Sequence, residues 1–569
     1  MKINGYEINF TEEELDKKLN TETLNVELIS QNFDGYKTLA DGDKTALKHL
    51  VNAARIVNDI SLEQDHPLNQ IQKKSLEDEA KINTHAAKAL RLFNSLNGVA
   101  GTNGLDKEPV QIFKGIKFLA GKNFYPADLN VYEFHNILIK MLNDGKTKEV
   151  QNILSARTIV RKKGSELEGI DFTEYFKKEF KLVADELEDA AKAVTNKDFK
   201  EYLNIQAKAL THNDNNLDMK ADIAWADLQD TPLEFTLSRE NYDDALTPTV
   251  YDNQELMKLL KNHNIEIDSK DTLGARVGII NKKGTDLILK FKNHMQKLAK
   301  LMPLNDRYEQ SIGGSDLKQT MVDVDLVSLK GDYAQCRGGM TVAQNLPNND
   351  KLSVKNGGGR RNVYHRQVRQ STDKEKTKKI LDALVDKNLH KYYDEEADHI
   401  FVIGHENGHS LGPNSTYQSA LGIYKAVIEE LKADVISLAF MPEYQKTGVI
   451  SEEELKKIYL TVSGRLFLKA EPQLVTPHRI ADLIIFNYLL ENKALSFDAN
   501  KKMSVDFNNI AKVCYNLLEE VIRLQLSKSP EQAKAFIDKY TRWTDISEYI
   551  ASIIKSFGVK LYKEIQAHF

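Results

Sequence analysis

The stretch FVIGHENGHSLGP, residues 401–413, places two histidines four residues apart and a glutamate directly after the first. On an α-helix, residues i and i+4 lie one turn apart on the same face, so His405 and His409 can point at one ion. Zinc binds imidazole nitrogens, and Glu406 beside the ion is in place to act as a general base. The pattern therefore demands a helix and a further ligand facing it. A chance match at this spacing stays an alternative on this motif alone.

A second helix has to supply that ligand, because a catalytic zinc site takes three protein ligands and leaves one position open. The stretch YKAVIEELKADVISLAF, residues 424–440, sets acidic side chains beside an apolar face. Unpaired buried carboxylates are costly, so these side chains need a cation. We predict Glu430 as the third ligand and Asp434 as the carboxylate that holds the outer nitrogen of a ligand histidine. Glu429 either holds the outer nitrogen of a ligand histidine, as Asp434 does, or is itself the third ligand in place of Glu430.

Two other considerations bear on this pair of motifs. Two imidazoles favour a borderline metal over a hard one, so the predicted ion is one Zn²⁺ rather than magnesium. The alternative is that Glu429 and Glu430 form a solvated helix edge and bind nothing.

The bulk properties of the chain exclude several classes of protein. A length of 569 residues predicts more than one hydrophobic core. A net charge of -5 gives no reason to expect nucleic acid or a membrane as a partner. Two cysteines rule out a disulfide framework and a cysteine-rich zinc module. Neither a signal-peptide pattern nor a long apolar run occurs, so we expect a cytoplasmic protein.

The order of sequence patterns predicts an α+β fold that is mostly α. Residues 11–230 carry apolar side chains at three- and four-residue steps, as in 176–194, which predicts helices. Between 230 and 370, the stretches PLEFTLS, VDVDLVSL and GGMTVAQNL alternate or are rich in β-formers, which predicts strands. Helices return from residue 371 to the end.

A glycine run at 357–359 precedes Arg360 and Arg361. It lacks the lysine and hydroxyl residue that end a phosphate-binding P-loop. We interpret it as a tight turn, and binding of a peptide carboxylate by Arg360 or Arg361 stays open.

HENGH followed by EELKAD resembles the zinc signature of the dipeptidyl peptidase III family of metallopeptidases, in its shorter bacterial and plant branch. Further segments resemble the same family in the same order along most of residues 115–500: SRENYDD (238–244), DTLGARVGIINKKGTDLILKF (271–291), AQNLPNNDKL (343–352) and TPHRIADLIIFNYLLENKALSF (476–497). Several motifs in one order are far more specific than the five-residue histidine motif alone.

The resemblance implies two lobes with a wide cleft. One lobe combines helices with a small β-barrel and is expected to hold residues 1–283, 321–371 and 546–569. The other is helical, bears the zinc and is expected to hold residues 284–320 and 372–545. The implied activity is a zinc exopeptidase that releases N-terminal dipeptides from short peptides.

The resemblance also implies roles for single residues. It assigns the zinc ligands as His405, His409 and Glu430, the general base as Glu406, and the groups that stabilise the oxyanion as His478 and Tyr242. It also implies that Glu240 binds the amino terminus of the peptide and that Asn345 and Asn348 bind its backbone. Without the resemblance, His478 reads as a cap or core histidine, Tyr242 as a packing residue and the two asparagines as turn residues.

The chain departs from the family pattern at two motif positions, and its region after about residue 500 aligns poorly with the family. Many members have one more residue between the two histidines, and an arginine expected one turn after His478 is replaced by Asp482. Two other functions stay open. One is a zinc aminopeptidase or other oligopeptidase, and the other is a catalytically silent peptide-binding protein. The intact Glu406 argues against the silent protein, because a binder has no need of the base.

Overall fold

The computed structural model describes the chain except residues 104–107, 241–243, 311–320, 335–342, 347–360, 474–475 and 559. The side chains of residues 343–346 and of Asn215, Asn362 and Ser415 also lie outside the description. The chain divides into two compact units. Unit 1 comprises Met1–Asn281, Val322–Ser371 and Lys560–Phe569, and unit 2 comprises Lys282–Met321 and Thr372–Val559.

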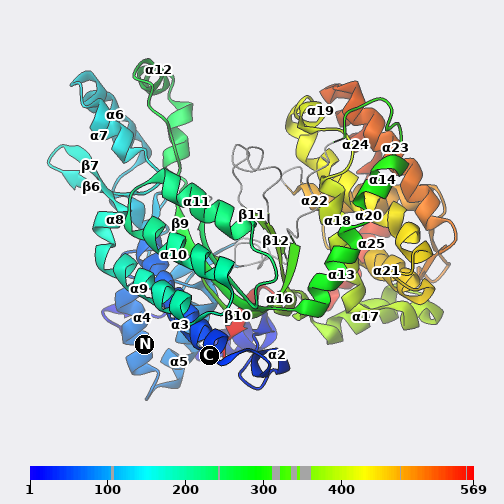
Figure 1. Ribbon diagram of the computed structural model, residues 1–569, viewed down its shortest axis with the longest axis horizontal. Helices are drawn as coiled ribbons and strands as arrows, with labels where there is room; N and C mark the ends of the chain where they lie inside the picture. Colours follow the sequence, from blue (N-terminus) through cyan, green and yellow to red (C-terminus); the bar gives the residue numbers. More distant parts are fainter. Residues whose placement is uncertain are drawn as a thin grey trace. The chain divides into compact units, whose positions relative to one another are not determined.

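Helices dominate both units, which confirms the fold class predicted from the sequence (Figure 1). The helices of unit 1 are α1 (Glu12–Asp16), α2 (Asp34–Lys37), α3 (Asp41–Asp65), α4 (Asn69–Glu79), α5 (Thr84–Leu96), α6 (Val131–Asn143), α7 (Thr147–Ile153), α8 (Phe172–Tyr175), α9 (Lys177–Ala193), α10 (Lys197–Thr211), α11 (Asn215–Ala226), α12 (Gln254–Asn262) and α16 (Arg366–Gln370). Helices α3, α9 and α10 lie side by side next to the main sheet.

The main sheet of unit 1 has five strands in the order β11-β12-β10-β9-β8. They are β8 (Leu233–Glu240), β9 (Thr272–Ile280), β10 (Met321–Gly331), β11 (Ala343–Leu346) and β12 (Arg361–His365). Strands β9 and β10 are buried along nearly their whole length, and α3 packs against β9. The strands predicted between 230 and 370 are confirmed where the structure describes them; residues 338–342 of the predicted strand GGMTVAQNL lie outside the described residues.

The small β-barrel of the prediction is not confirmed. Within the described residues the sheet is open, with β11 at one edge and β8 at the other. The remaining strands of unit 1 form two-stranded pairs: β1 (Lys2–Ile3) with β2 (Tyr6–Glu7), β3 (Thr23–Glu27) with β15 (Tyr562–Gln566), β4 (Ala100–Thr102) with β5 (Pro109–Gln111), and β6 (Thr158–Lys163) with β7 (Glu166–Asp171).

Unit 2 is a helical bundle built around α20. Its helices are α13 (Lys282–Lys292), α14 (Met295–Leu301), α17 (Lys374–Leu384), α18 (Glu395–His409), α19 (Ser415–Ser419), α20 (Lys425–Lys446), α21 (Glu452–Arg465), α22 (Pro477–Glu491), α23 (Ile510–Ser527), α24 (Pro530–Tyr540) and α25 (Asp545–Ser556). A short hairpin joins β13 (Leu495–Phe497) to β14 (Met503–Val505). Helices α18, α22 and α23 all pack on α20.

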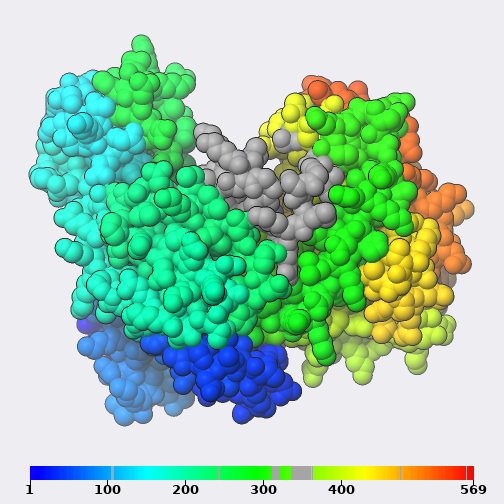
Figure 2. Space-filling model, viewed as in Figure 1, coloured from blue at the N-terminus to red at the C-terminus, as the bar shows by residue number. Residues whose placement is uncertain are grey.

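Unit 2 also joins segments that are distant in the sequence. Figure 2 shows the green surface of α13 and α14 next to yellow and orange segments from beyond residue 440. Helix α25 packs on α17, so residues 546–559 belong to unit 2, whereas the prediction had grouped them with the β-containing lobe. Among the described residues, no helix is both long and apolar enough to cross a membrane.

Candidate metal centre

The motif HENGH lies in the last turns of α18. Asp394 caps the helix, its side chain accepting from the backbone N–H of Glu396 at 3.0 Å. Acidic residues occupy the first turn and His409 the last, as the helix dipole favours. Because the segment is regular α-helix through His409, His405 and His409 share one face, as the four-residue spacing predicts.

Two glycines let α18 approach α20 closely. A Cβ atom at Gly404 would lie 2.3 Å from Ser437 Oγ, and one at Gly408 would lie 2.8 Å from the carbonyl oxygen of Ala433. Neither position tolerates a side chain without moving the helices apart. The Ser437 hydroxyl also donates to the carbonyl of Phe401 at 2.8 Å. The glycines thus bring the histidines of α18 within reach of the carboxylates of α20.

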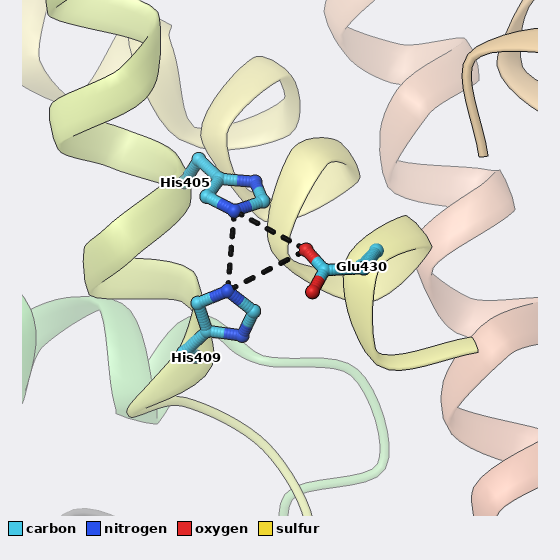
Figure 3. Close-up of side chains that lie close together, drawn as sticks. All are labelled: His405, His409 and Glu430. Carbon is cyan, nitrogen blue, oxygen red and sulfur yellow. Dashed lines mark hydrogen bonds and ion pairs between the residues drawn. The ribbon is translucent and has the colours of Figure 1, made fainter. Parts of the chain in front are cut away.

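Three donor atoms converge between the two helices (Figure 3). The Nε2 atoms of His405 and His409 lie 3.1 Å apart. Glu430 Oε2 lies 3.4 Å from the first of them and 3.7 Å from the second. This oxygen is buried and receives no hydrogen bond within the described residues. His405, His409 and Glu430 therefore form a cluster that can hold a metal ion.

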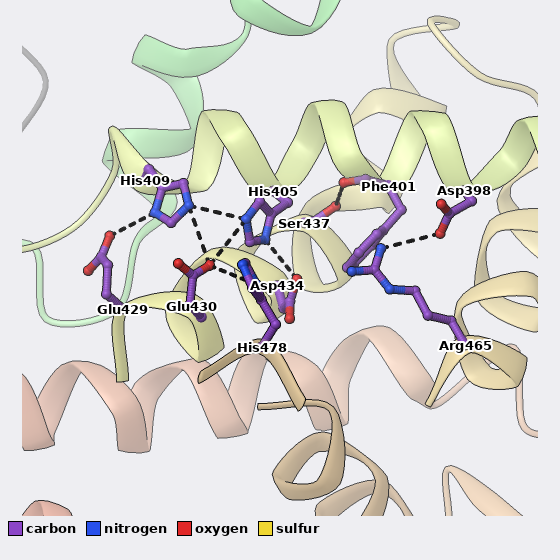
Figure 4. Close-up of polar contacts among 10 residues, drawn as sticks. All are labelled: Asp398, Phe401, His405, His409, Glu429, Glu430, Asp434, Ser437, Arg465 and His478. Carbon is purple, nitrogen blue, oxygen red and sulfur yellow. Dashed lines mark hydrogen bonds and ion pairs between the residues drawn. The ribbon is translucent and has the colours of Figure 1, made fainter. Parts of the chain in front are cut away.

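The outer nitrogen of each histidine faces a carboxylate (Figure 4). His405 Nδ1 lies 2.7 Å from Asp434 Oδ1, and His409 Nδ1 lies 3.1 Å from Glu429 Oε1. A carboxylate accepts and cannot donate, so each Nδ1 carries the proton and each Nε2 presents a lone pair. Two lone pairs and a carboxylate oxygen that face one another repel unless a cation or proton lies between them.

The separations of the donor atoms fit a small tetrahedral ion. For ligand bonds of about 2.0–2.1 Å, tetrahedral ligand atoms lie about 3.3 Å apart. The three distances in the cluster, 3.1, 3.4 and 3.7 Å, bracket that value. The positions of Glu430 Oε2 and of the two histidine Nε2 atoms thus fit a metal ion, and so do their negative charge and electron density.

The electrostatics of His405 point the same way. Burial alone would lower the pKa of its imidazole, but Asp434 raises it, with smaller contributions from Glu406 and Glu430, to about 9. Without a metal the site therefore draws a proton, which is the smallest cation that can separate these groups.

The two outer carboxylates are held by cations of their own. Burial would raise the pKa of Glu429, but Lys432, whose Nζ lies 2.9 Å from Glu429 Oε1, and His409 lower it to about 2. Gln525 of α23 donates to the other Glu429 oxygen at 3.3 Å. Burial likewise opposes ionisation of Asp434, and His405 and then Arg465 lower its pKa. Both carboxylates are thus kept charged.

Arg465 lies at the end of α21, beside Phe401 and Asp398 (Figure 4). Its Nη1 donates to Asp398 Oδ1 at 3.3 Å, and its guanidinium carbon lies 5.0 Å from the centre of the Phe401 ring. This residue, Lys432, Gln525 and the two glycines were not singled out from the sequence. A signal existed for the glycines, because Gly404 and Gly408 repeat at four residues and small residues at that spacing allow close helix packing.

Two further predicted residues lie beside the cluster. Glu406 is half-buried on α18, directly after His405. His478 begins α22 after Pro477, and its Nδ1 lies 3.2 Å from Glu430 Oε2. Its side chain is 59% exposed, so the ring forms part of the surface and not the core. Asp482, one turn later, is buried and accepts from Arg479 at 3.0 Å.

The other predicted residues belong to unit 1. Glu240 is buried at the end of β8, opposite Thr272 of β9. Asn345 lies in β11 opposite Asn362, and its side chain is not described. Tyr242 and Asn348 lie outside the described residues.

Of the two arginines left open as carboxylate ligands, Arg360 lies outside the described residues. Arg361 is 1% exposed, donates to the Leu228 carbonyl and pairs with Glu234. Because it is buried and already paired, Arg361 is not available to a peptide.

No family model matches the chain. Nudix hydrolase 3 of Arabidopsis thaliana is 24% identical over 559 residues, a match that covers 88% of this chain and 68% of that protein. The structure of DPP III from Caldithrix abyssi superimposes with a TM-score of 0.77 at 24% identity, covering 95% of this chain and 97% of the other.

A second solved structure, dipeptidyl-peptidase III from Corallococcus sp. strain EGB, has a TM-score of 0.69 at 19% identity and covers 97% of both chains. The chain therefore has the two-lobed fold of these dipeptidyl peptidase III structures over nearly its whole length.

Proposed function

We propose that the chain is a zinc-dependent exopeptidase that releases dipeptides from the N-termini of short peptides. The observation that carries the proposal is the cluster of His405, His409 and Glu430 on a fold shared with dipeptidyl peptidase III structures. Two imidazoles and one carboxylate are a ligand set typical of catalytic zinc in peptidases. Carboxylates on both outer nitrogens support the same role, because they fix the tautomer and the orientation of each ring.

Zinc bound in this cluster would supply Lewis acidity, which polarises a carbonyl and makes water more acidic. Glu406 follows His405 on the same helix, so its carboxylate takes the proton from the attacking water and later delivers it to the leaving amine. His478 sits 3.2 Å from Glu430 Oε2, at the edge of the cluster, where its ring can donate to the oxygen that becomes negative.

Residues of unit 1 have roles that rest on the resemblance alone. Tyr242 is proposed as a second donor to the oxyanion. Glu240 would pair with the free ammonium group of the peptide, which fixes the cleaved bond two residues away. Asn345 and Asn348 would bind backbone N–H and C=O groups of the peptide.

The test is incubation of the zinc-loaded protein with tetrapeptides to hexapeptides, each free or N-acetylated, followed by mass spectrometry of the products. We expect dipeptides from the free peptides and little product from the acetylated ones. Release of single residues would favour the aminopeptidase alternative. Glu406→Ala should lower turnover by roughly 100- to 10,000-fold and leave zinc content unchanged. Peptide binding without any cleavage by the wild type would favour the silent binder.

A further inference from the structure

The first turn of α22 carries a cation that the proposed chemistry does not use. Arg479 directly follows His478, and its Nη1 lies 3.0 Å from Asp482 Oδ2. The Arg479 side chain is 57% exposed, whereas that of Asp482 is 3% exposed. The carboxylate of Asp482 is therefore buried, while the Arg479 guanidinium that it holds stays at the surface.

This arrangement differs from an ordinary surface ion pair. A pair between two exposed side chains is mobile and contributes little. Here the acceptor is rigid, because Asp482 lies in the packed face of α22, where Arg465 and Asp434 also act on its charge. One nitrogen of Arg479 is fixed, and within the described residues its other N–H groups have no hydrogen-bond acceptor. A guanidinium held in this way is preorganised for a second carboxylate.

The position of Arg479 limits what that carboxylate can belong to. Its neighbour His478 reaches to 3.2 Å from Glu430 Oε2, in the cluster where the proposed function places the cleaved carbonyl. One residue spans about 3.8 Å of chain. In a tripeptide or tetrapeptide that loses its N-terminal dipeptide, the C-terminal carboxylate lies one or two residues beyond the cleaved bond, at about 4–7 Å.

We propose that Arg479, anchored by Asp482, is a specificity-determining residue that binds the C-terminal carboxylate of very short peptides. The inference rests on the proposed function and deepens it, because it names tripeptides and tetrapeptides with a free C-terminus as favoured substrates. It also explains the aspartate at position 482, where the family pattern has an arginine, because Asp482 holds Arg479. The cation is supplied three residues earlier in the helix and is held in place by the aspartate.

The experiment compares each tetrapeptide with its C-terminal amide, using kcat/KM as the readout. In the wild type we expect the free acid to be cleaved roughly 10- to 100-fold more efficiently than the amide, the usual value of a charged hydrogen-bonded pair. Arg479→Gln should reduce this preference to about twofold or less by slowing the free acid alone. Arg479→Lys should restore part of the preference, since it keeps the charge but not the fork of donors.

The matched control is Arg523→Gln, which removes another surface arginine of unit 2. Arg523 pairs with Glu519 on α23, and its side chain is 55% exposed. This variant should leave the preference unchanged. Asp482→Asn should give an intermediate preference, because Arg479 stays but loses its anchor.

Three outcomes would overturn the proposal. An unchanged preference in Arg479→Gln removes the role of the guanidinium, and an equal loss for acid and amide assigns Arg479 a general role in the fold or the reaction. Either result leaves the proposed function standing. If the wild type cleaves neither form of any peptide, the proposed function fails and takes this inference with it.

Discussion

Two carboxylates, one in each unit, are surrounded by nitrogen donors in different ways. In unit 1, Glu234 is completely buried and its Oε1 accepts from Trp225 Nε1 at 2.9 Å and from Thr236 Oγ1 at 2.6 Å. Arg276 and Arg361 stand beside its two oxygens at 3.4 and 3.5 Å. In unit 2, Glu430 Oε2 faces imidazole nitrogens and receives no hydrogen bond among the described residues.

The difference separates a structural carboxylate from a ligand. Both carboxylates have one buried oxygen, Oε2, that receives no hydrogen bond among the described residues. The charge of Glu234 is nevertheless balanced by two guanidinium groups that the chain itself supplies. Glu430 pairs instead with imidazole groups, those of His405, His409 and His478, while Lys432 of the same helix pairs with Glu429. A buried carboxylate oxygen without a hydrogen bond is costly, and a metal ion held by Glu430 Oε2 and the two ligand histidines would remove that cost.

The largest expected effect is on metal binding by Glu430→Gln. Zinc in a folded site is bound by about 10–16 kcal/mol, so loss of one ligand of three should weaken binding by roughly 1000-fold. Titration calorimetry with zinc measures this. The thermal midpoint of the metal-free protein should not fall, since Glu430 Oε2 has no hydrogen bond to lose. Wild-type affinity in Glu430→Gln, with Glu429→Gln losing zinc instead, would move the third ligand to Glu429.

Glu234→Gln should behave in the opposite way. It leaves two buried guanidinium groups without their shared anion, which should lower the free energy of unfolding by about 3–5 kcal/mol. Urea unfolding measures the loss, and zinc affinity should stay at the wild-type value. Glu201→Gln, an exposed change on α10 of the same unit, is the control and should shift stability by less than about 0.5 kcal/mol. A loss of zinc in Glu234→Gln would break the distinction between the two carboxylates.

The metal-free protein should be more stable in mild acid than in base. The pKa of His405 is raised to about 9 from 6.5, so its contribution is fully present below pH 6.5 and is lost as the pH rises through 9. Between about pH 6 and about pH 10 this amounts to roughly 3 kcal/mol of unfolding free energy. Denaturation in the presence of a chelator measures it, with Asp434→Asn as the comparison. Equal slopes in the two proteins would show that the Asp434 pair does not hold the proton.

The outer carboxylates should give the next smaller effect. Asp434→Asn and Glu429→Gln each remove the group that orients one ligand histidine, and each should weaken zinc binding by roughly 10- to 100-fold. Asp434→Asn should be the more damaging of the two, because its contact is shorter, 2.7 Å against 3.1 Å, and more deeply buried. A reversal of that order would mean that the contact with His409 dominates.

The smallest expected effect is that of Gln525→Leu on α23. The amide supports Glu429 at 3.3 Å, while Lys432 holds the other oxygen at 2.9 Å. Zinc affinity should therefore fall by less than about tenfold. Gln532→Leu on the exposed face of α24 should leave it unchanged. A loss as large as that of Glu429→Gln would mean that Gln525, and not Lys432, fixes the carboxylate.

The sequence identified the cluster because helix geometry is local. His405 and His409 share a face by their spacing, and Glu430 and Asp434 share another for the same reason. The spacing of residues within one helix does not predict which side chains from other helices reach the cluster. Gln525 comes from α23 and Arg465 from α21, and their contacts are set by how the bundle packs.

The strands of unit 1 could also be predicted from a local pattern, whereas the open or closed form of their sheet could not. Alternation along β8 and β10 is visible in the sequence, because side chains of a strand point alternately to its two faces. An open or closed sheet depends on whether β8 and β11 pair, and no local pattern encodes that. The grouping of residues 546–559 is likewise not encoded by a local pattern, since it depends on the packing of α25 against α17.

The most direct test of the account is X-ray absorption at the zinc edge of the purified, metal-loaded protein. The account predicts one zinc ion per chain, with two imidazole nitrogens at about 2.0–2.1 Å and oxygen for the remaining ligands. The imidazole signal should be lost in the double variant of His405→Ala and His409→Ala. Sulfur among the ligands, or the same spectrum in that variant, would contradict the assignment of the metal to His405, His409 and Glu430.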